Sequence, residues 1–374
     1  MNVLHIINSL EIGGAQKLLT DILPLMKNSG VNVSLLVLKS VDNSFDAKIR
    51  NSGIQIYSLN CKSYYNPLLI LRLFPLRMKY QIIHVHLFPA LYWVALTNLL
   101  FPSAMLFFTE HSTNNRRRGK KILFLIERFI YGQYKRIISI SPQTQSNLKE
   151  WLNAKDNDSR FVQISNGVNL SDFFINNEKK YAKIFDVSRK TKIVLMISRF
   201  SIQKDHETVI RAIPHIVADN VIFVFAGTGP TIEHCQRLAR ELGVLNKIIF
   251  LGQRDDIPEL ISASYIGVQS SFWEGFGLTA VEFMAGKKPV IASNVAGLKQ
   301  VVEGAGLLFP AGNEKYLAYC ITKLLIDKQY YNQISERCFN RAFQYDIHMM
   351  VEKYIEEYKK VLSKKINAGS FHRS

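Results

Sequence analysis

The sequence predicts an α/β protein with two doubly wound domains, each built around a parallel β-sheet. Three observations support this prediction. Short apolar runs alternate with amphipathic, helix-like segments along nearly the whole chain, as in repeated βαβ units. One polar, charged stretch divides the alternation into two series, and each series begins with an apolar run and a turn. The chain has 374 residues, 48% of them hydrophobic, and is therefore long enough to form two cores.

The apolar runs have the length and composition of strands that are covered on both faces of a parallel sheet. In the first series they are Val3–Ile7, Asn32–Leu38, Gln55–Leu59, Ile82–His86, Met105–Thr109, Ile137–Ile140 and Phe161–Ile164. In the second series they are Ile193–Ile197, Ile222–Ala226, Ile248–Leu251, Tyr265–Val268, Pro289–Ala292 and Gly306–Phe309. We expect each series to form one sheet.

Helices are expected between the strands. Candidates are Ala15–Lys27, Thr144–Trp151 and Glu207–Val217. A terminal helix, Ile347–Leu362, has apolar residues at helical spacing. The nearly uncharged stretch Val85–Thr109 has the length of a membrane span. Pro89 and Pro102 interrupt it, however, and a strand, the helix Ala90–Leu100 and a second strand account for the same residues.

The polar stretch between the two series, Asn176–Lys183, is interpreted as an interdomain linker. We therefore expect an N-terminal domain over residues 1–176, a C-terminal domain over residues 185–345 and a terminal helix over residues 346–374. Ligands of open α/β sheets bind beyond the carboxyl ends of the strands. With two such sheets, the active site is expected in the cleft between the domains.

The formal charge of +17 favours an anionic partner. The strongest basic cluster comprises Arg116, Arg117, Arg118, Lys120 and Lys121. An apolar, helix-like segment, Ile122–Tyr134, follows it, and a basic end on such a helix is typical of a membrane-surface segment. A solvated helix face explains the same residues and stays an alternative. Nucleic acid is not expected, because no groove-reading motif accompanies the charge.

The N-terminal segment and the cysteines indicate the cellular compartment. The N-terminal segment Met1–Ile7 lacks a basic head and a small-residue cleavage site, and therefore resembles a strand more than a signal peptide. The cysteines lie far apart and form no CxxC pair, which disfavours a disulfide framework or a zinc site. We expect a cytoplasmic protein, peripheral on the inner face of the membrane.

The strongest chemical signal is a pair of carboxylates, Glu274 and Glu282, that flank a glycine turn after a predicted strand. The first precedes a predicted helix and the second lies inside it. The turn residues are Gly275, Phe276, Gly277 and Leu278. Glycines let backbone N–H groups approach a ligand closely, and a helix N-terminus favours phosphate.

Two cations follow the first strand of the second series. Arg199 offers a planar bidentate fork and Lys204 a compact charge, and both suit a diphosphate. The glycine turn Gly227–Gly229 follows the next strand. In the first series, Gly13 and Gly14 lie between a strand and a helix, and His111 follows the strand that ends at Thr109. 

These motifs, in this order from about Val3 to Phe309, resemble those of glycosyltransferase family 4, a family of retaining enzymes with the GT-B fold. The resemblance implies that Arg199 and Lys204 bind the donor diphosphate, that Glu274 binds donor-sugar hydroxyls and that Glu282 binds the nucleotide ribose. It also implies a catalytic role for His111, Arg199, Lys204 and Glu274. His111 matches the family's histidine at the donor-sugar site. Donor contacts are further implied for Gly14, Gly275, Phe276, Gly277 and Leu278.

The family resemblance also implies that the terminal helix crosses back to the first domain and that the anomeric configuration is retained. Two positions depart from the family pattern, where glutamate is usual at the positions of Gln16 and Gln300. Asp156-Asn157-Asp158 has the DxD pattern of a metal site but lies in a polar loop, and no other hard-cation cluster is evident. We expect no metal and no cofactor, since the nucleotide sugar is a substrate.

The resemblance predicts a sugar transferase of bacterial surface polysaccharide synthesis, such as capsule or lipopolysaccharide. The expected donor is a UDP-sugar, with GDP- and ADP-sugars as alternatives. The basic, apolar segment favours an acceptor at a membrane surface, namely a glycan linked to an isoprenoid diphosphate. Two other readings remain: a sugar-nucleotide epimerase, and a GT-B module for membrane assembly that has lost catalysis.

Overall fold

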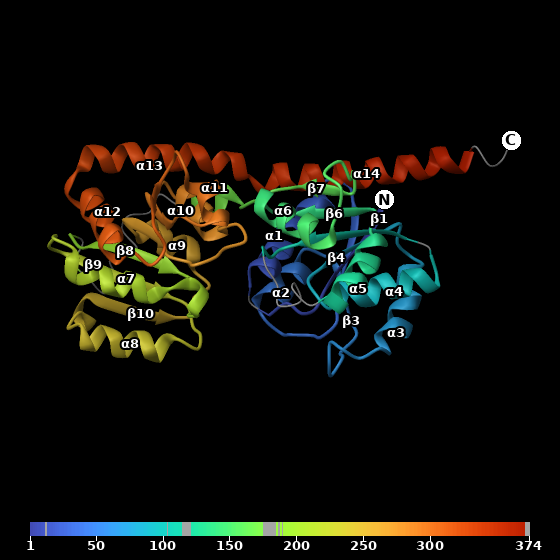
Figure 1. Ribbon diagram of the computed structural model, residues 1–374, viewed down its shortest axis with the longest axis horizontal. Coiled ribbons are helices and arrows are strands. Elements are labelled where there is room, and N and C mark those ends of the chain that lie inside the picture. Colours follow the sequence, from blue (N-terminus) through green and yellow to red (C-terminus); the bar gives the residue numbers. More distant parts are fainter. Residues whose placement is uncertain are drawn as a thin grey trace. The chain divides into compact units, whose positions relative to one another are not determined.

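The structure is a computed structural model that describes residues 1–11, 13–102, 104–113, 121–174, 185, 188 and 190–370. The chain divides into two compact units, which Figure 1 shows in sequence colours. The first unit comprises Met1–Gly167 and Ile347–Ser374, and the second comprises Val168–Asp346. The expected linker, residues 176–183, lies outside the described residues.

The first unit is a seven-stranded parallel sheet in the order β3-β2-β1-β4-β5-β6-β7. Its strands are β1 (Asn2–Ile7), β2 (Asn32–Val37), β3 (Gln55–Ser58), β4 (Ile82–His86), β5 (Met105–Glu110), β6 (Arg136–Ser139) and β7 (Phe161–Gln163). Its helices are α1 (Gly14–Asn28), α2 (Ser44–Asn51), α3 (Leu69–Arg77), α4 (Ala90–Leu100), α5 (Lys121–Gly132), α6 (Pro142–Leu152) and α14 (Ile347–Ser370).

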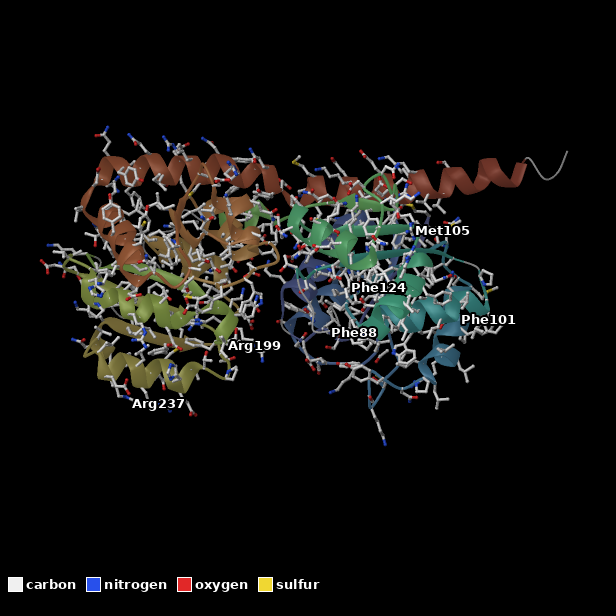
Figure 2. The ribbon with its side chains drawn as sticks, in the orientation of Figure 1. Phe88, Phe101, Met105, Phe124, Arg199 and Arg237 are labelled. Carbon is white, nitrogen blue, oxygen red and sulfur yellow. The ribbon has the colours of Figure 1, made fainter. Side chains whose placement is uncertain are left out.

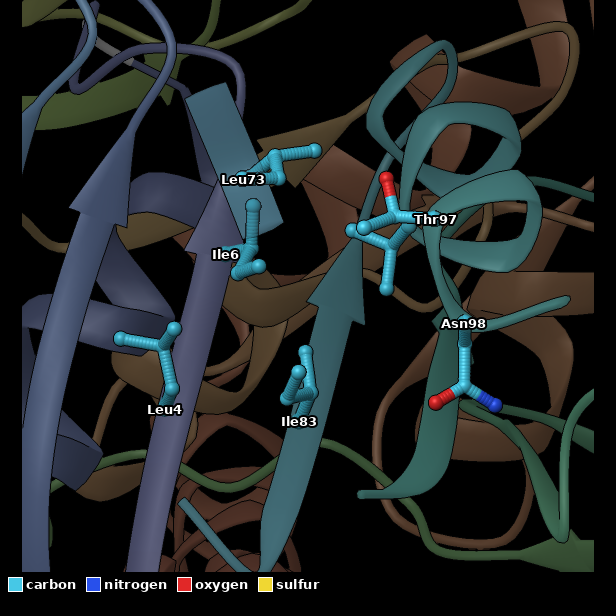
Figure 3. Close-up of a pocket in the computed structure, with 7 residues that line it drawn as sticks. Leu4, Ile6, Leu73, Ile83, Thr97 and Asn98 are labelled. Atoms are coloured by element: carbon cyan, nitrogen blue, oxygen red, sulfur yellow. The ribbon is translucent and has the colours of Figure 1, made fainter. Parts of the chain in front are cut away.

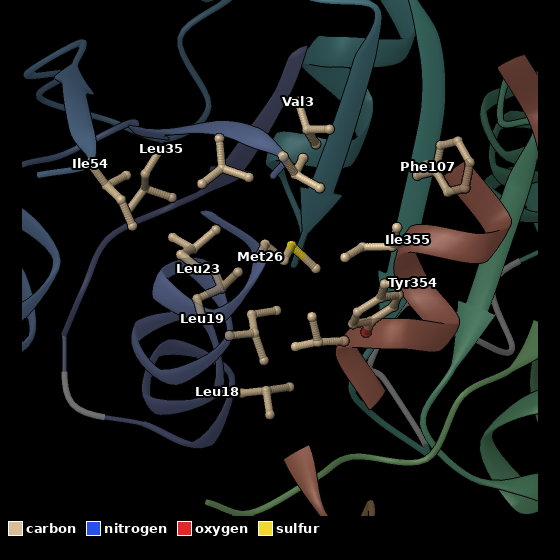
Figure 4. Close-up of a cluster of buried hydrophobic side chains, with 14 of the residues drawn as sticks. Val3, Leu18, Leu19, Leu23, Met26, Leu35, Ile54, Phe107, Tyr354 and Ile355 are labelled. Carbon is tan, nitrogen blue, oxygen red and sulfur yellow. The ribbon is translucent and has the colours of Figure 1, made fainter. Parts of the chain in front are cut away.

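Helices cover both faces of this sheet, because successive residues of a strand point to opposite sides. Val3 and Ile7 of β1 belong to a core that includes side chains of α1 and α14, whereas Leu4 and Ile6 belong to a core with side chains of α3 to α6. Figure 4 shows the first of these cores, in which Tyr354 and Ile355 of α14 lie near Phe107 and Met26. The terminal helix is thus part of the first unit.

The second unit is a six-stranded parallel sheet in the order β10-β9-β8-β11-β12-β13. Its strands are β8 (Lys192–Ile197), β9 (Val221–Ala226), β10 (Ile248–Gly252), β11 (Ile266–Gln269), β12 (Val290–Ser293) and β13 (Leu307–Phe309). Its helices are α7 (His206–Ala212), α8 (Ile232–Glu241), α9 (Ile257–Ala263), α10 (Leu278–Ala285), α11 (Ala296–Val302), α12 (Glu314–Ile326) and α13 (Lys328–Ala342). Two Rossmann-like parallel sheets confirm the predicted fold class.

One predicted helix, Glu207–Val217, is wrong at its end. Helix α7 ends at Ala212, and a short 3-10 turn, Ile213–His215, follows. Pro214 causes this change, because its ring carries no N–H to continue the α-helical hydrogen bonds.

A cavity in the first unit shows where the packing is incomplete. Figure 3 shows its lining, which is Leu4, Ile6, Leu73, Ile83, Val94, Thr97 and Asn98. Its volume is about 10 Å³, close to the space of one water molecule. It is therefore a gap in the core rather than a ligand site. Among the helices of the described residues, none is both long and apolar enough to cross a membrane.

Candidate functional site

The candidate site residues of the second unit gather where the strand order of the sheet reverses. Strands β8 and β11 are neighbours there, and the loops after them lead to helices α7 and α10. Ligands of open α/β sheets bind beyond the carboxyl ends of the strands at such a point. Arg199 and Lys204 follow β8, and Glu274 follows β11, so the fold brings both predicted cations to the side of the sheet that carries the predicted carboxylate.

The segment that carries Lys204 is bound to the loop after β11. The buried Ser270 hydroxyl donates to the backbone oxygens of Lys204 and Asp205, at 3.1 and 2.7 Å. The Phe272 N–H donates to the backbone oxygen of Gln203 at 2.8 Å, and the Gln203 side-chain amide donates to the Trp273 carbonyl at 2.9 Å. These bonds fix the position of the Lys204 backbone relative to Glu274.

Lys204 and Glu274 form an ion pair. Both side chains are mostly shielded, with 22% of the Lys204 side chain and 15% of the Glu274 side chain exposed. The Ser271 hydroxyl and the Gly275 N–H also donate to the Glu274 carboxylate, at 3.4 and 3.2 Å. The carboxylate is therefore held by three donors, which give it a defined position.

Glycines set the position of the loop that carries Arg199. A Cβ atom on Gly227 would lie 2.0 Å from the Ser198 carbonyl oxygen, and one on Gly229 would lie 2.1 Å from the Phe200 carbonyl oxygen. Both glycines have a positive φ, which disfavours other residues. The glycine turn after β9 thus packs directly against the backbone on both sides of Arg199, whose side chain is exposed (Figure 2).

His206 packs against the same loop. Its ring stacks on Phe200 with the ring centroids 3.9 Å apart, and its Nε2 lies 3.1 Å from the Ser198 hydroxyl. Burial lowers the pKa of His206 to about 3, so the ring is neutral at physiological pH. His206 therefore has a packing role, although it lies close to Lys204 in sequence.

Glu282 lies inside helix α10, as predicted, and is 4% exposed. The helix begins after Gly277, whose φ is +98°. Phe276 is buried and packs edge-on against Tyr345, with the ring centroids 5.3 Å apart. The Phe276 side chain therefore holds the turn in place by packing. The group that Phe276 can offer to a ligand is its backbone N–H.

Helix α11 approaches the Glu274 turn very closely. A Cβ atom on Gly297 would lie 2.3 Å from the Glu274 carbonyl oxygen, which explains why this position holds a glycine. Gln300, on the same helix, accepts a hydrogen bond at its backbone oxygen from the Tyr345 hydroxyl, at 3.0 Å. Its side-chain nitrogen is buried without a partner in the part of the chain that the structure describes.

The first unit holds the remaining predicted residues. Gly14 begins helix α1 and is exposed. The Gln16 side chain folds back towards Gly13, and a Cβ atom on Gly13 would lie 2.7 Å from the Gln16 side-chain oxygen. His111 follows β5, and its Nε2 lies 3.1 Å from Nδ1 of the buried His86. Burial lowers the pKa of His111 to about 4, so it is a neutral group with one donor and one acceptor.

Other predicted residues lie outside these clusters or outside the described structure. Arg116, Arg117, Arg118 and Lys120 lie outside the described residues, and Lys121 begins helix α5. In the DxD-like loop, the Asp158 carboxylate pairs with the Arg160 guanidinium at 2.6 Å. Sequence reasoning missed Ser270, Ser271 and His206. They lie close to Glu274 or Lys204 in sequence, but their roles depend on contacts between distant segments.

Solved structures share this fold. The Anabaena protein HepE, solved in complex with UDP and glucose, matches with a TM-score of 0.85 and 20% identity, over 96% of this chain and 100% of that one. A glycosyltransferase from Rickettsia africae matches with a TM-score of 0.82 and 23% identity, over 96% and 98%. At these identities the likeness establishes the fold alone, and this fold is the predicted GT-B fold.

Family models identify the group more closely. The model described as Glycosyltransferase Family 4 matches residues 12–172, and the one described as Glycosyl transferases group 1 matches residues 177–341. The chain belongs to glycosyltransferase family 4. The expected family and enzyme class are thereby confirmed, while the roles of individual residues stay predictions.

Curated relatives are similar over part of their length. An N,N'-diacetylbacillosaminyl-diphospho-undecaprenol alpha-1,3-N-acetylgalactosaminyltransferase of Campylobacter jejuni is 29% identical over 203 residues, which is 52% of this chain and 53% of the relative. A UDP-Gal:alpha-D-GlcNAc-diphosphoundecaprenol alpha-1,3-galactosyltransferase of Escherichia coli is 27% identical over 205 residues, again 52% and 53%. The match to these two proteins thus spans about half of their length.

Proposed function

We propose that this protein transfers a sugar from a UDP-sugar to a lipid-linked glycan acceptor, with retention of the anomeric configuration, in the synthesis of a surface polysaccharide. The observation that carries this proposal is the Lys204–Glu274 ion pair at the point where the strand order of the second sheet reverses. A cation and a carboxylate at that point suit the two ends of a sugar diphosphate, whose phosphates are anionic and whose sugar offers hydroxyl groups.

In the proposed reaction, the bond between the anomeric carbon and the diphosphate oxygen breaks, and a bond from that carbon to an acceptor hydroxyl oxygen forms. The hydroxyl proton passes to the departing diphosphate on the same face of the sugar. Arg199 and Lys204 stabilise the negative charge that develops on the diphosphate, together with N–H groups at the start of α10. Glu274 binds sugar hydroxyls and Glu282 binds the ribose.

We also propose that transfer needs no metal ion. Fixed cations take over the charge stabilisation that a divalent ion supplies in other sugar transferases. The proposal predicts that EDTA leaves the transfer rate unchanged and that added Mn²⁺ or Mg²⁺ does not raise it. A rate that falls with EDTA and returns with a divalent ion would show that the cations are insufficient.

Names of relatives support the acceptor class. The Campylobacter jejuni and Escherichia coli proteins are named for acceptors on an undecaprenyl diphosphate, and the second is named for a UDP-sugar donor. The HepE structure contains UDP and glucose. We therefore propose the same chemical classes for this chain, namely a UDP-sugar and a glycan on an isoprenoid diphosphate.

An exposed apolar surface in the first unit supports a lipid-linked acceptor. Large apolar side chains are exposed on and beside the three neighbouring helices α3, α4 and α5. They are Leu68, Leu71, Phe74, Met78, Leu99, Leu100, Phe101, Leu125, Ile126 and Phe129, and we call this set the apolar patch. Phe101 lies at the outer edge of the unit, with its ring centroid 4.5 Å from that of Phe74 (Figure 2).

Cations accompany the apolar patch. Arg72, Lys79 and Arg128 are exposed on the same helices or next to them, and the whole chain carries a formal charge of +17. Exposed apolar side chains with basic neighbours are typical of surfaces that enter the head-group region of an anionic bilayer. We therefore propose that the protein is cytoplasmic and binds the inner face of the membrane through the apolar patch.

A transfer assay tests the proposed function. The purified protein is incubated with radiolabelled UDP-sugars and with short glycans on undecaprenyl diphosphate, and lipid-extractable label and free UDP are measured. We expect equal amounts of labelled lipid and UDP with one sugar, and neither product with Lys204→Met. UDP-sugar epimerisation without acceptor, or binding without any turnover, would contradict the proposal in favour of an epimerase or of a module that has lost catalysis.

A further inference from the structure

A chain of hydrogen bonds links the terminal helix α14 to His111 across the first unit. The side chains are, in order, Tyr354, Thr109, His84, Tyr358, His5, His86 and His111. The successive distances are 3.3, 2.8, 2.5, 3.5, 3.0 and 3.1 Å. Tyr354 and Tyr358 lie on α14, and the other groups lie on or directly after the neighbouring strands β1, β4 and β5.

The strand register explains how the histidines meet. His5 of β1 is the parallel partner of His84 of β4, and His86 lies on the same face of β4 two residues later. That face is the one that α14 covers, so both tyrosine hydroxyls reach the histidine rings from the helix side. The first six members of the chain are 0% exposed.

Each histidine in the chain is neutral, because burial without a counter-charge lowers the pKa values of all four. A neutral imidazole has one N–H donor and one acceptor nitrogen. Whenever one nitrogen donates, the other must accept. Each hydroxyl in the chain has one proton, which is satisfied within the chain only if it is donated to a neighbour. A hydroxyl that accepts from one neighbour therefore donates to the other, and with these two conditions the direction of one hydrogen bond sets the direction of the next.

The Tyr354 end determines that direction. The hydroxyl of Tyr354 contacts Thr109 Oγ1, its one hydrogen-bond contact in the described structure, so its proton is satisfied only if it donates there. Thr109 then donates to His84, His84 to Tyr358, Tyr358 to His5, His5 to His86 and His86 to His111. The opposite direction leaves the buried Tyr354 hydroxyl proton without an acceptor, which costs about 1–3 kcal/mol.

A metal site is the other reading of the histidine cluster. Ligand nitrogens of His5, His84 and His86 all lie within 4.8 Å of one another. However, the rings of His5 and His86 are stacked at 14° and those of His84 and His86 at 26°, whereas nitrogen lone pairs lie in the ring planes. Both nitrogens of His84 are also hydrogen-bonded to hydroxyl groups. A hydrogen-bond chain explains these contacts better than a metal site.

We propose that this chain holds His111 in the tautomer that carries its proton on Nδ1, so that His111 presents an N–H donor to a sugar ligand at this end of the sheet. His86, His5 and Tyr358 are positioning residues, because they act on the ligand through His111. The identity of the ligand rests on the proposed function, whereas the tautomer does not. The chain thus makes α14 part of the support for the site, beyond its packing role in the core.

Nitrogen NMR of the protein labelled with ¹⁵N-histidine tests the tautomer directly. The resonances of His111 are assigned by their loss in His111→Gln. In the wild-type protein, without substrate, we expect a protonated Nδ1 and an unprotonated Nε2 on His111. A protonated Nε2 would overturn the proposal, whatever the outcome of any activity assay.

Two tyrosine variants separate the hydrogen-bond chain from general packing. Tyr358→Phe removes the link between His84 and His5. Tyr134→Phe is the matched control, because Tyr134 is equally buried but donates to the Leu91 carbonyl, at 2.7 Å, in the core on the other face of the sheet. Tyr358→Phe is expected to shift the His111 nitrogen resonances towards a tautomer mixture and to lower kcat about tenfold, with little change in the KM for the acceptor.

Tyr134→Phe is expected to leave both the resonances and kcat unchanged. Equal effects of the two variants would show that the chain has only a structural role. If no UDP-sugar is turned over at all, the proposed function fails, but the nitrogen resonances still decide whether the chain sets the His111 tautomer.

Discussion

Lys204 and Glu274 lie 70 positions apart in sequence and form an ion pair between the loops that follow two neighbouring strands. In this pair each charge is neutralised by the other. A bound sugar diphosphate offers both groups new partners, since its phosphates attract the ammonium group and its hydroxyls donate to the carboxylate. The ion pair is therefore expected to rearrange when the donor binds.

This relationship predicts opposite effects of two substitutions on UDP binding. Lys204→Met removes a charge-assisted contact to the diphosphate and is expected to weaken UDP about tenfold or more, since such a contact contributes about 1.5–3 kcal/mol. Glu274→Gln releases Lys204 from its ion pair, so UDP affinity should stay the same or increase while sugar transfer is lost. Calorimetric titration with UDP measures both. Equal weakening by the two variants would contradict the proposed division of roles.

The glycine turn after β9 gives a second prediction. In Gly227→Ala the new methyl group would lie 2.0 Å from the Ser198 carbonyl oxygen, and the residue would keep a φ of +143°. The loop that carries Arg199 must therefore move. We expect a loss of about 1–3 kcal/mol in the free energy of unfolding and weaker UDP binding, measured by urea denaturation and titration.

Gly243→Ala is the matched control for this substitution. Gly243 also has a positive φ, of +66°, but no atom lies within 4 Å of its added Cβ. We expect it to destabilise the fold by about 1 kcal/mol through backbone strain alone and to leave UDP affinity unchanged. Loss of UDP binding in both variants would show that strain, rather than displacement of the Arg199 loop, causes the effect.

The two ends of the Lys204–Glu274 pair were predictable from sequence, but their pairing was not. Each lies in a motif with recognisable residue types at short range. Their contact depends on β8 lying next to β11, and alternating strands and helices do not specify that order. The apolar runs were distinct enough to predict the strands to within a residue or two. The end of α7 was missed because Pro214 acts against an otherwise helical pattern.

The hydrogen-bond chain through the histidines was likewise not predictable from sequence. His84 and His86 lie two residues apart in the predicted strand Ile82–His86, and the alternation of side chains along a strand places both on one face. His5 is in a different strand, and only the parallel register of β1 and β4 brings it opposite His84. Tyr354 and Tyr358 come from the terminal helix. Such a chain is a property of tertiary structure and has no short-range signal.

Buried neutral histidines predict acid sensitivity. Burial lowers the pKa values of His5 and His206 to about 3 and of His111 to about 4, from 6.5. Below about pH 6.5 the unfolded chain binds protons that the folded protein does not, so stability falls as the pH falls, until the folded pKa values are reached. Each such histidine contributes about 1.4 kcal/mol per pH unit. Urea midpoints from about pH 7 to pH 5 should therefore decrease steeply.

His206→Gln tests this assignment. The variant lacks one of the histidines that protonate only on unfolding, so its stability should depend less steeply on pH, by about 1.4 kcal/mol per pH unit. The control is His215→Gln, at an exposed position of the same unit, which should keep the wild-type slope. An unchanged slope in His206→Gln would mean that the acid sensitivity arises elsewhere.

The apolar patch predicts binding to anionic vesicles. Leu125 and Phe129 on α5 are 67% and 51% exposed, so at least half of each apolar side chain contacts water. Insertion of two such side chains into a bilayer surface is favourable by about 1.5–3 kcal/mol each at full burial. Leu125→Ser with Phe129→Ser should therefore reduce flotation with phosphatidylglycerol vesicles at least tenfold, without lowering the free energy of unfolding, because neither side chain contributes to the core.

Val217→Ser supplies the matched control, since Val217 is 80% exposed and belongs to the second unit rather than to the helices that carry the apolar patch. It should float like the wild-type protein. Basic residues near the patch add an electrostatic contribution of about 1 kcal/mol each, which salt screens. Flotation of the wild type should therefore decrease with salt and with a neutral lipid. If the double variant floats as well as the wild type, the membrane contact lies elsewhere, and the basic cluster before α5 becomes the segment to mutate.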